Sequence, residues 1–343
     1  MTRYGISLPS LNTSLGDIAE MITTAENAGL DSTWSYEFFR TPYAGMAAAA
    51  PRTRRITLAT GAAIALTRTP FTTANAIADI DELSGGRAAL GLAAGSPDFL
   101  GIFHNTPLTK PISRMRDYLG AVYASWDYLA HGKPGSYQGE YYSVNFPDPD
   151  AFPFDPRPLV RDRIPLYLAA MRPAMIRLAA EMTDGVLGAA MSIPYLKDVV
   201  FPNVAIGARR ANRDPSTVDV ASETIICVSK DRSEAWRRAR IQAGLYAAHP
   251  VCEPVVRAAG LDKEQAAVRE ALMTKGPSAL QDVTDEKLIE LLSVTGTPDE
   301  CRRKLKEYEE VLPHIIFHTP YAPPLSAEES ADSFRSSLET FGR

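Results

Sequence analysis

Three side chains that can transfer protons stand at the ends of apolar, strand-like runs of the sequence. Glu37 and His318 each close such a run, and Asp98 follows one at a distance of three residues. Carboxylates and imidazoles serve as general acids or bases when they are held beside a reacting atom. Each residue also has a purely structural interpretation. Glu37 could be neutralised by a salt bridge, and His318 could be a buried histidine whose nitrogens are hydrogen-bonded. We take the three residues as candidate catalytic groups.

Small residues at the ends of similar runs form a second set, because they let a ligand approach the backbone. Arg172 stands before Pro173, which suits the first turn of a helix, and the free amides of such a turn favour an anion. Tight core packing and an ordinary strand–helix junction are the structural alternatives. The candidate cofactor-binding residues are Gly61, Ala62, Ala94, Gly95, Ser96, Ala170, Met171, Arg172 and Gly188.

The segment 84–96 predicts two different uses of glycine. Gly85 and Gly86 lie between a predicted helix and the next strand, so we expect a left-handed helix end there, with Arg87 packed locally. Gly95 leaves that strand at its carboxyl end, where barrel enzymes bind their ligands. We therefore expect Gly95→Val to abolish cofactor binding while the melting temperature stays close to that of the wild type.

Eight apolar runs alternate with amphipathic, helix-like segments along the chain. This alternation indicates βαβ units and a parallel sheet that is buried on both faces. The simplest closed arrangement is an α/β fold, the (β/α)8 TIM barrel. An open doubly wound sheet is the alternative, but no G-x-G-x-x-G motif follows the first run. The predicted strands are 3–9, 31–37, 55–64, 86–95, 164–170, 185–190, 218–229 and 313–318.

Two segments depart from the alternation and predict insertions after the fourth helix and near the seventh. Residues 131–163 are rich in proline, glycine, aspartate and tyrosine, and their part 136–144 predicts a hairpin. Residues 250–293 have a helical pattern. Pro202 should kink or split the long helix that contains it. We expect one domain over residues 1–343.

Composition excludes several classes of function. The chain has 343 residues and a net charge of −5, with 36 basic and 41 acidic residues and no basic block, which argues against nucleic acid as a partner. No apolar stretch is long enough for a membrane span or a signal peptide. Three scattered cysteines indicate reduced thiols, and we expect a cytoplasmic protein. The five histidines lack metal-ligand spacing, so we expect no metal.

Three segments in combination resemble the luciferase-like oxidoreductase superfamily. Residues 61–99 contain T-R-x-P, a helix, S-G-G-R, a strand and L-G-L-x-x-G in that order; residues 167–190 contain R-P-A-M and D-G-V; residues 283–311 contain G-T-P-D-E-C. The resemblance runs from the first strand to the eighth and is weakest in 131–163 and 250–282. Within the superfamily the chain is similar to the coenzyme F420 branch that includes methylenetetrahydromethanopterin reductase.

The resemblance implies a barrel that binds a flavin or deazaflavin at the carboxyl ends of its strands. It also implies a non-proline cis peptide bond, at Gly61-Ala62, behind the deazaflavin ring. Sugar-phosphate dehydrogenases of this branch carry an Asp-His pair where Glu37-Phe38 stands here, and a catalytic glutamate where Ser96 stands. That activity is therefore not expected, and the general acid is not carried over from these relatives.

Three functions follow from these observations. The first is an F420-dependent oxidoreductase that transfers a hydride between the deazaflavin and a small organic substrate. The second is an FMN-dependent monooxygenase that uses oxygen and reduced flavin from a partner reductase. The third is a flavin-binding barrel without catalysis. Phenylalanines such as Phe38 and Phe99 suit an apolar or aromatic substrate, although core packing explains aromatic residues equally well. The resemblance also makes a homodimer an option.

Overall fold

Eight parallel strands close into a barrel in the computed structural model, which describes residues 2–8, 13–151 and 159–343. Each strand pairs with its neighbour, and pairings of β9 with β10 and of β12 with β1 complete the ring. The predicted (β/α)8 barrel is therefore confirmed, and the open sheet is excluded. In order around the ring the strands are β1 (Arg3–Leu8), β2 (Ser32–Ser35), β3 (Thr57–Thr60), β5 (Ala88–Ala93), β8 (Leu166–Ala169), β9 (Gly185–Ala189), β10 (Asp219–Val228) and β12 (His314–His318).

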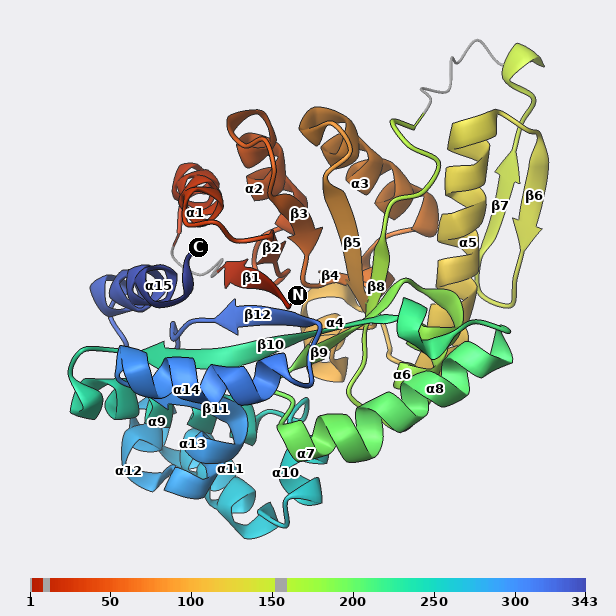
Figure 1. The fold of residues 1–343 in the computed structure, drawn as a ribbon. Helices are drawn as coiled ribbons and strands as arrows, with labels where there is room; N and C mark the ends of the chain where they lie inside the picture. The colour runs from red at the N-terminus through yellow and green to blue at the C-terminus, as the bar shows by residue number, and fades with distance from the viewer. Residues whose placement is uncertain (1, 9–12, 152–158) are drawn as a thin grey trace.

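Helices surround this ring, as Figure 1 shows. Proline at the first turn and a hydroxyl cap fix several starts: Thr69 accepts a hydrogen bond from the Thr72 amide at the start of α3, and Thr297 forms a capping box at the start of α14. The outer helices are α1 (Leu15–Asn27), α2 (Pro42–Ala49), α3 (Pro70–Ser84), α5 (Pro111–His131), α6 (Pro173–Met182), α8 (Phe201–Arg210), α9 (Arg232–Ala248), α14 (Pro298–Glu309) and α15 (Ala327–Phe341).

The turn after α3 has the structural role that the sequence predicts. Gly85 ends the helix with a φ of 67°, and Gly86 follows with a φ of 88°. Arg87 donates hydrogen bonds to the carbonyl oxygens of Ala50, Thr53 and Ile56. These bonds tie α3 and β5 to the chain before β3, at the amino-terminal end of the barrel and away from the strand ends where barrel enzymes act.

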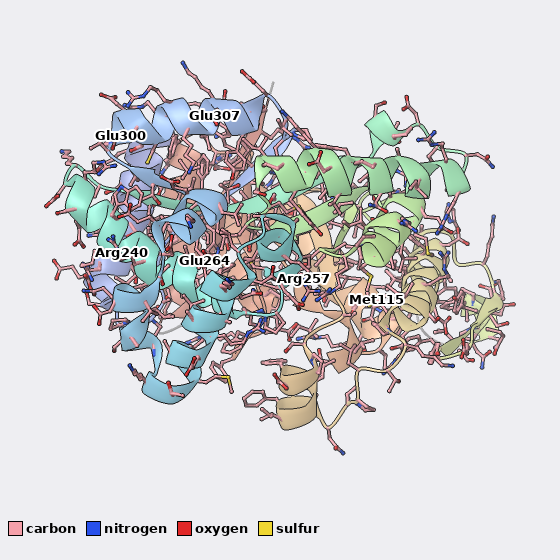
Figure 2. All side chains as sticks on the ribbon, turned by 90° about the horizontal axis from the view of Figure 1, so that it is seen from below. Met115, Arg240, Arg257, Glu264, Glu300 and Glu307 are labelled. Atoms are coloured by element: carbon pink, nitrogen blue, oxygen red, sulfur yellow. The ribbon has the colours of Figure 1, made fainter. Side chains whose placement is uncertain are left out.

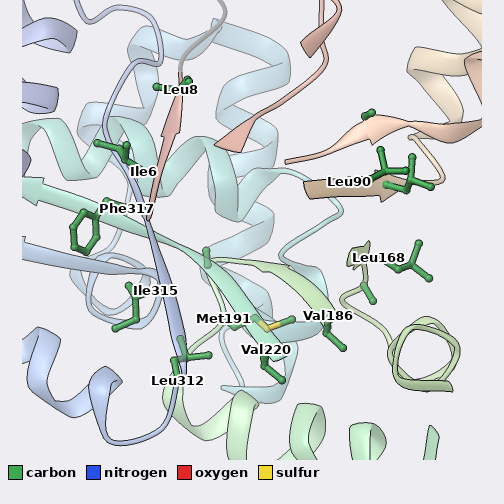
Figure 3. Packing of buried hydrophobic residues seen from close by; sticks show 14 of the residues in the cluster. Ile6, Leu8, Leu90, Leu168, Val186, Met191, Val220, Leu312, Ile315 and Phe317 are labelled. Atoms are coloured by element: carbon green, nitrogen blue, oxygen red, sulfur yellow. The ribbon is translucent and has the colours of Figure 1, made fainter. Parts of the chain in front are cut away.

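Side chains alternate between the barrel interior and the helix layer, as the two-residue period of a strand requires. Outward side chains such as Ile6, Val186, Val220 and Phe317 pack against the helices (Figure 3). The middle of the interior is filled by one small cluster of inward side chains, namely Trp34, Ala59, Ala89, Tyr167, Leu187, Ala221 and Ile316. This plug leaves polar inward residues above it and below it.

Both predicted insertions lie outside the barrel. The hairpin of β6 (Gly135–Gln138) and β7 (Ser143–Phe146) stands beside α5 in Figure 1, where Asp117 of α5 accepts from the Tyr137 hydroxyl at 2.7 Å. Residues 152–158 of that insertion lie outside the described residues. The second insertion, which carries Arg257 and Glu264 in Figure 2, is helical as expected. Its helices are α10 (Glu253–Ala258), α11 (Asp262–Lys275), α12 (Leu280–Val283) and α13 (Glu286–Leu292).

Three local features refine the prediction. Pro202 lies in the first turn of α8, directly after a π-helical turn at 196–200 that follows a short α7 (Ile193–Tyr195). The backbone stays helical throughout, so the helix is interrupted by a π-turn next to the proline and is not split in two. The sequence analysis predicted neither β11 (Ser293–Gly296), which pairs with β10 outside the ring, nor the short helix α4 (Pro97–His104). In the part of the chain that the structure describes, no helix is long and apolar enough to cross a membrane.

Candidate active site

The lower polar layer of the barrel interior, at the amino-terminal ends of the strands, is a closed hydrogen-bond network. Asp219 pairs with Arg3 at 2.6 Å, accepts from the Tyr167 hydroxyl at 2.9 Å and lies 3.3 Å from Nδ1 of His314. Nε2 of His314 in turn contacts the Ser32 hydroxyl at 2.8 Å. Burial would raise the pKa of Asp219, but the hydrogen bond from His314 and the charge of Arg3 outweigh it and lower that pKa. The layer is therefore an ionised and satisfied structural unit.

The upper polar layer, at the carboxyl ends of the same strands, is not satisfied. Glu223 lies four residues beyond Asp219 on β10, His318 four beyond His314 on β12, and Ser7 four beyond Arg3 on β1. Among the described residues, Oε1 of Glu223, Nδ1 of His318 and Oγ of Ser7 are buried and have no hydrogen-bond partner. Nδ1 of His318 lies 3.9 Å from Oε2 of Glu223, which is too long for a hydrogen bond.

Burial sets the protonation of this layer. It raises the pKa of Glu223 to about 7, an effect that the nearby Ser7 hydroxyl only partly opposes. It lowers the pKa of His318 to about 3. In the described ranges, His318 is the only basic side chain with a nitrogen within 4.0 Å of the Glu223 carboxylate. The pair is therefore neutral between about pH 3 and about pH 7, with the proton on the carboxyl group rather than on the imidazole.

The far side of His318 is held by two residues of α9. The Tyr246 hydroxyl lies 2.8 Å and the Gln242 amide nitrogen 3.3 Å from Nε2 of His318. The amide orientation of Gln242 is fixed because its oxygen accepts from the backbone amides of Tyr321 and Ala322. The Gln242 nitrogen therefore donates to Nε2, and a neutral His318 carries its hydrogen on Nδ1, the atom that faces Glu223.

The three predicted catalytic residues do not meet. His318 lies in the upper layer, whereas the Glu37 carboxylate accepts two hydrogen bonds from Arg68, at 2.6 and 2.7 Å, and one from the Ile64 amide at 2.8 Å. The salt-bridge alternative for Glu37 is therefore what the structure shows, and it ties the segment after β3 to the end of β2. Asp98 is exposed in the first turn of α4, where its charge acts on His249. Catalytic roles for Glu37 and Asp98 remain predictions.

The break in the third strand has the expected form. The bond between Gly61 and Ala62 is cis and separates β3 from β4 (Ala63–Ile64). A Cβ atom added at Gly61 would lie 2.8 Å from Cβ of Trp34, so only glycine fits against the plug at this position. Ala62 is partly exposed, and its carbonyl oxygen accepts from the Glu37 amide at 3.1 Å.

Gly95 is required by the backbone itself. Its φ is 90°, and an added Cβ atom would lie 2.9 Å from Cγ2 of Ile64 and 3.1 Å from Cγ of Leu100. Ser96 caps α4 by accepting from the Phe99 amide at 3.2 Å, and Ala94 packs partly buried against the core. The expectation that Gly95→Val leaves the melting temperature unchanged was therefore wrong, because valine is strained here whatever binds nearby.

The segment after β8 reaches the same end of the barrel. Arg172 precedes α6 and pairs with Glu253 of the helical insertion at 3.0 Å. Met171 is held through its carbonyl oxygen by the Tyr195 hydroxyl at 2.5 Å, and the buried Ala170 donates its amide to Leu187. The side-chain position of Gly188 faces Met191 and not the interior. The small inward residue on β9 is therefore its neighbour Ala189.

A comparison with known protein families decides the classification of this barrel. The family model of luciferase-like monooxygenases matches residues 2–315. The chain belongs to this family. The family contains F420-dependent reductases and monooxygenases that are related to this chain, and both are oxidoreductases. The protein is therefore an oxidoreductase.

Two curated luciferase-like relatives are 5,10-methylenetetrahydromethanopterin reductases. The one from Archaeoglobus fulgidus is 33% identical over 314 residues, which cover 88% of this chain and 89% of the relative. The one from Methanolobus tindarius is 30% identical over 318 residues, which cover 89% of this chain and 91% of the relative. Among solved structures, the coenzyme F420-dependent tetrahydromethanopterin reductase from Methanopyrus kandleri superposes with a TM-score of 0.84, at 25% identity, over 98% of each chain.

Sequence reasoning missed two members of the upper layer of this luciferase-like barrel, Glu223 and Ser7. A signal was present in the strand 218–229, where a glutamate interrupts a run of apolar and small residues. Its parity with Asp219 would have placed both carboxylates on one face of the strand. Whether that face points inward depends on the register with β9 and β12, which local sequence does not determine.

Proposed function

We propose that the protein is an F420-dependent oxidoreductase that transfers a hydride between the deazaflavin and a small organic substrate. The observation that carries this proposal is the match of 98% of the chain, at 25% identity and a TM-score of 0.84, to a reductase described as coenzyme F420-dependent. When bound, F420 would supply the hydride chemistry. The barrel would orient the two reactants, exclude water and provide the proton.

The residues at the carboxyl ends of the strands fit a flat ring. Ala62, Ala93, Ala169 and Ala189 are partly exposed there, and Ala62 and Ala169 pack on the interior plug. Such small side chains leave space above the plug. The backbone at Gly61-Ala62 and at 94–96 would contact the ring, and residues 170–172 with the first turn of α6 would hold an anionic group. Arg172 is well placed for this because its side chain is 58% exposed.

Four phenylalanines at this end favour an apolar or aromatic substrate. Phe38 stacks on Phe99 with ring centres 5.5 Å apart, and Phe103 contacts both Phe99 and Phe39. Phe38, Phe39 and Phe103 are 42%, 66% and 52% exposed, so core packing does not explain them. They extend the rim formed by the loop after β2 and by α4, next to the ends of the barrel strands.

Reduced F420 and candidate acceptors test this function directly. We expect anaerobic protein to oxidise reduced F420 in the presence of at least one small C=C–C=O, C=O or C=N compound, followed by the return of F420 absorbance. 2-Cyclohexen-1-one, benzaldehyde and a cyclic imine are suitable first acceptors. The FMN-dependent alternative, which the family name favours, predicts no such turnover. It predicts oxygen uptake when reduced FMN from a reductase is supplied.

A further inference from the structure

We propose that Glu223 is the catalytic acid of this barrel and that it protonates the heteroatom of a carbonyl or imine substrate. This inference rests on the proposed hydride transfer and assigns the proton that such a reaction requires. The resemblance to relatives supplied no general acid, and the structure places Glu223 inside the barrel at the end where ligands bind.

The position of Glu223 carries the inference. Its backbone is fixed on both sides, because β10 pairs with β9 and β12, and its carbonyl oxygen accepts from the Ala190 amide at 2.6 Å. Its side chain points inward with Ala221 and Asp219 and is 11% exposed. In contrast to Asp219, its Oε1 atom has no partner among the described residues. A buried carboxyl without a partner destabilises a fold, so stability does not account for it.

The surroundings suit an acid that is neutral at rest. The groups that act on Glu223 are His318 of β12, Ser7 of β1, Tyr246 of α9, Cys252 and Tyr321, and none of them is positively charged at neutral pH. Nδ1–H of His318 and the Ser7 hydroxyl are donors without partners. They would stabilise the carboxylate that forms when Glu223 loses its proton.

The proton balance of the step is simple. The substrate carbon would receive the hydride from reduced F420, which is thereby oxidised. The π-electron pair of the C=O or C=N bond would then move to the heteroatom. The O–H bond of Glu223 breaks and an O–H or N–H bond forms on the substrate. The carboxylate then takes a proton from water. His318 acts as a positioning residue through Nδ1, and it is itself oriented by Tyr246 and Gln242.

Infrared difference spectroscopy on the free protein provides a test that does not depend on turnover. Spectra of wild type minus Glu223→Gln are compared between about pH 5 and about pH 9. We expect a protonated carboxyl band that is shifted by deuterium and disappears near pH 7. A carboxyl group that is already ionised at about pH 5 would overturn the proposal.

Kinetics with reduced F420 separate this proposal from the proposed function. We expect Glu223→Gln to bind F420 like the wild type but to lose at least about 100-fold in kcat, together with the pH dependence near 7, and Glu223→Asp to recover part of the rate. A wild-type kcat in Glu223→Gln would overturn the role of Glu223 but would leave the proposed function intact. Failure of the wild-type protein to bind F420 would instead count against the proposed function.

Discussion

The two polar layers inside the barrel are built on the same strands but treat their carboxylates in opposite ways. Asp219 in the lower layer is paired with Arg3 and hydrogen-bonded to Tyr167. Glu223 in the upper layer faces donors, and its Oε1 atom bonds to none of the described residues. Since an unpaired buried polar group costs about 1–3 kcal/mol, stability favours the lower arrangement and not the upper one. The comparison separates a layer that stabilises the barrel from one that we propose carries chemistry.

The largest expected effect on stability is at Asp219. We expect Asp219→Asn to lower the free energy of unfolding by about 2–4 kcal/mol, because it weakens charge-assisted hydrogen bonds and leaves Arg3 without its partner. The matched variant on the same strand face is Glu223→Gln, which we expect to be neutral or stabilising at about pH 7–8, where the wild-type carboxyl begins to ionise. Urea unfolding measures both. Equal losses in the two variants would remove the distinction between the layers.

The pH dependence of stability sharpens the same comparison. The pKa of Glu223 is raised from 4.5 to about 7 in the folded protein. The contribution of this raised pKa to the free energy of unfolding is therefore fully present below about pH 4.5 and is lost as the pH rises through about 7. The lowered pKa of Asp219 has the opposite sign, so its contribution is lost as the pH falls. We expect Glu223→Gln to gain up to about 3 kcal/mol relative to the wild type between about pH 5 and about pH 8. Parallel pH profiles would contradict this.

A smaller effect tests whether Gly95 serves the fold or only a ligand. We expect Gly95→Ala to lower the free energy of unfolding by about 1–2 kcal/mol, because its φ of 90° and the contact with Ile64 oppose any side chain. Gly101→Ala, in α4 with open space around it, is the control and should be neutral or stabilising by up to about 1 kcal/mol. Thermal unfolding checks both variants. Unchanged stability in Gly95→Ala would mean that the fold does not require Gly95 and that it serves only ligand binding.

The smallest expected effect on stability is at Arg172. Its ion pair with Glu253 is exposed, so Arg172→Ala should change the free energy of unfolding by less than about 1 kcal/mol. Arg116→Ala, which removes another exposed pair with Glu181 on the outer helices, should do the same. Only Arg172→Ala should weaken F420 binding, by about tenfold, if the start of α6 holds an anionic group. Fluorescence titration would show this, and equal affinities would exclude Arg172 from the site.

The sequence predicted the fold more completely than the site, for physical reasons. Apolar runs are buried on both faces in a parallel barrel, so all eight strands were visible locally. The short strand β11 was missed because residues 293–296 follow a helical pattern without a break. Glu37 was found at the right end of the barrel, but its pairing with Arg68 joins residues that are 31 apart in the chain. Glu223 was missed because its inward direction is set by its neighbouring strands.

The most direct test of the central claim is a pair of equilibrium titrations of the purified protein, with F420 and with FMN, each in oxidised and reduced form. The account predicts tight binding of F420 and binding of FMN at least about tenfold weaker, which corresponds to about 1.4 kcal/mol of discrimination. A preference for reduced FMN, with oxygen uptake once it is bound, would contradict the account and make the protein a monooxygenase that depends on a reductase.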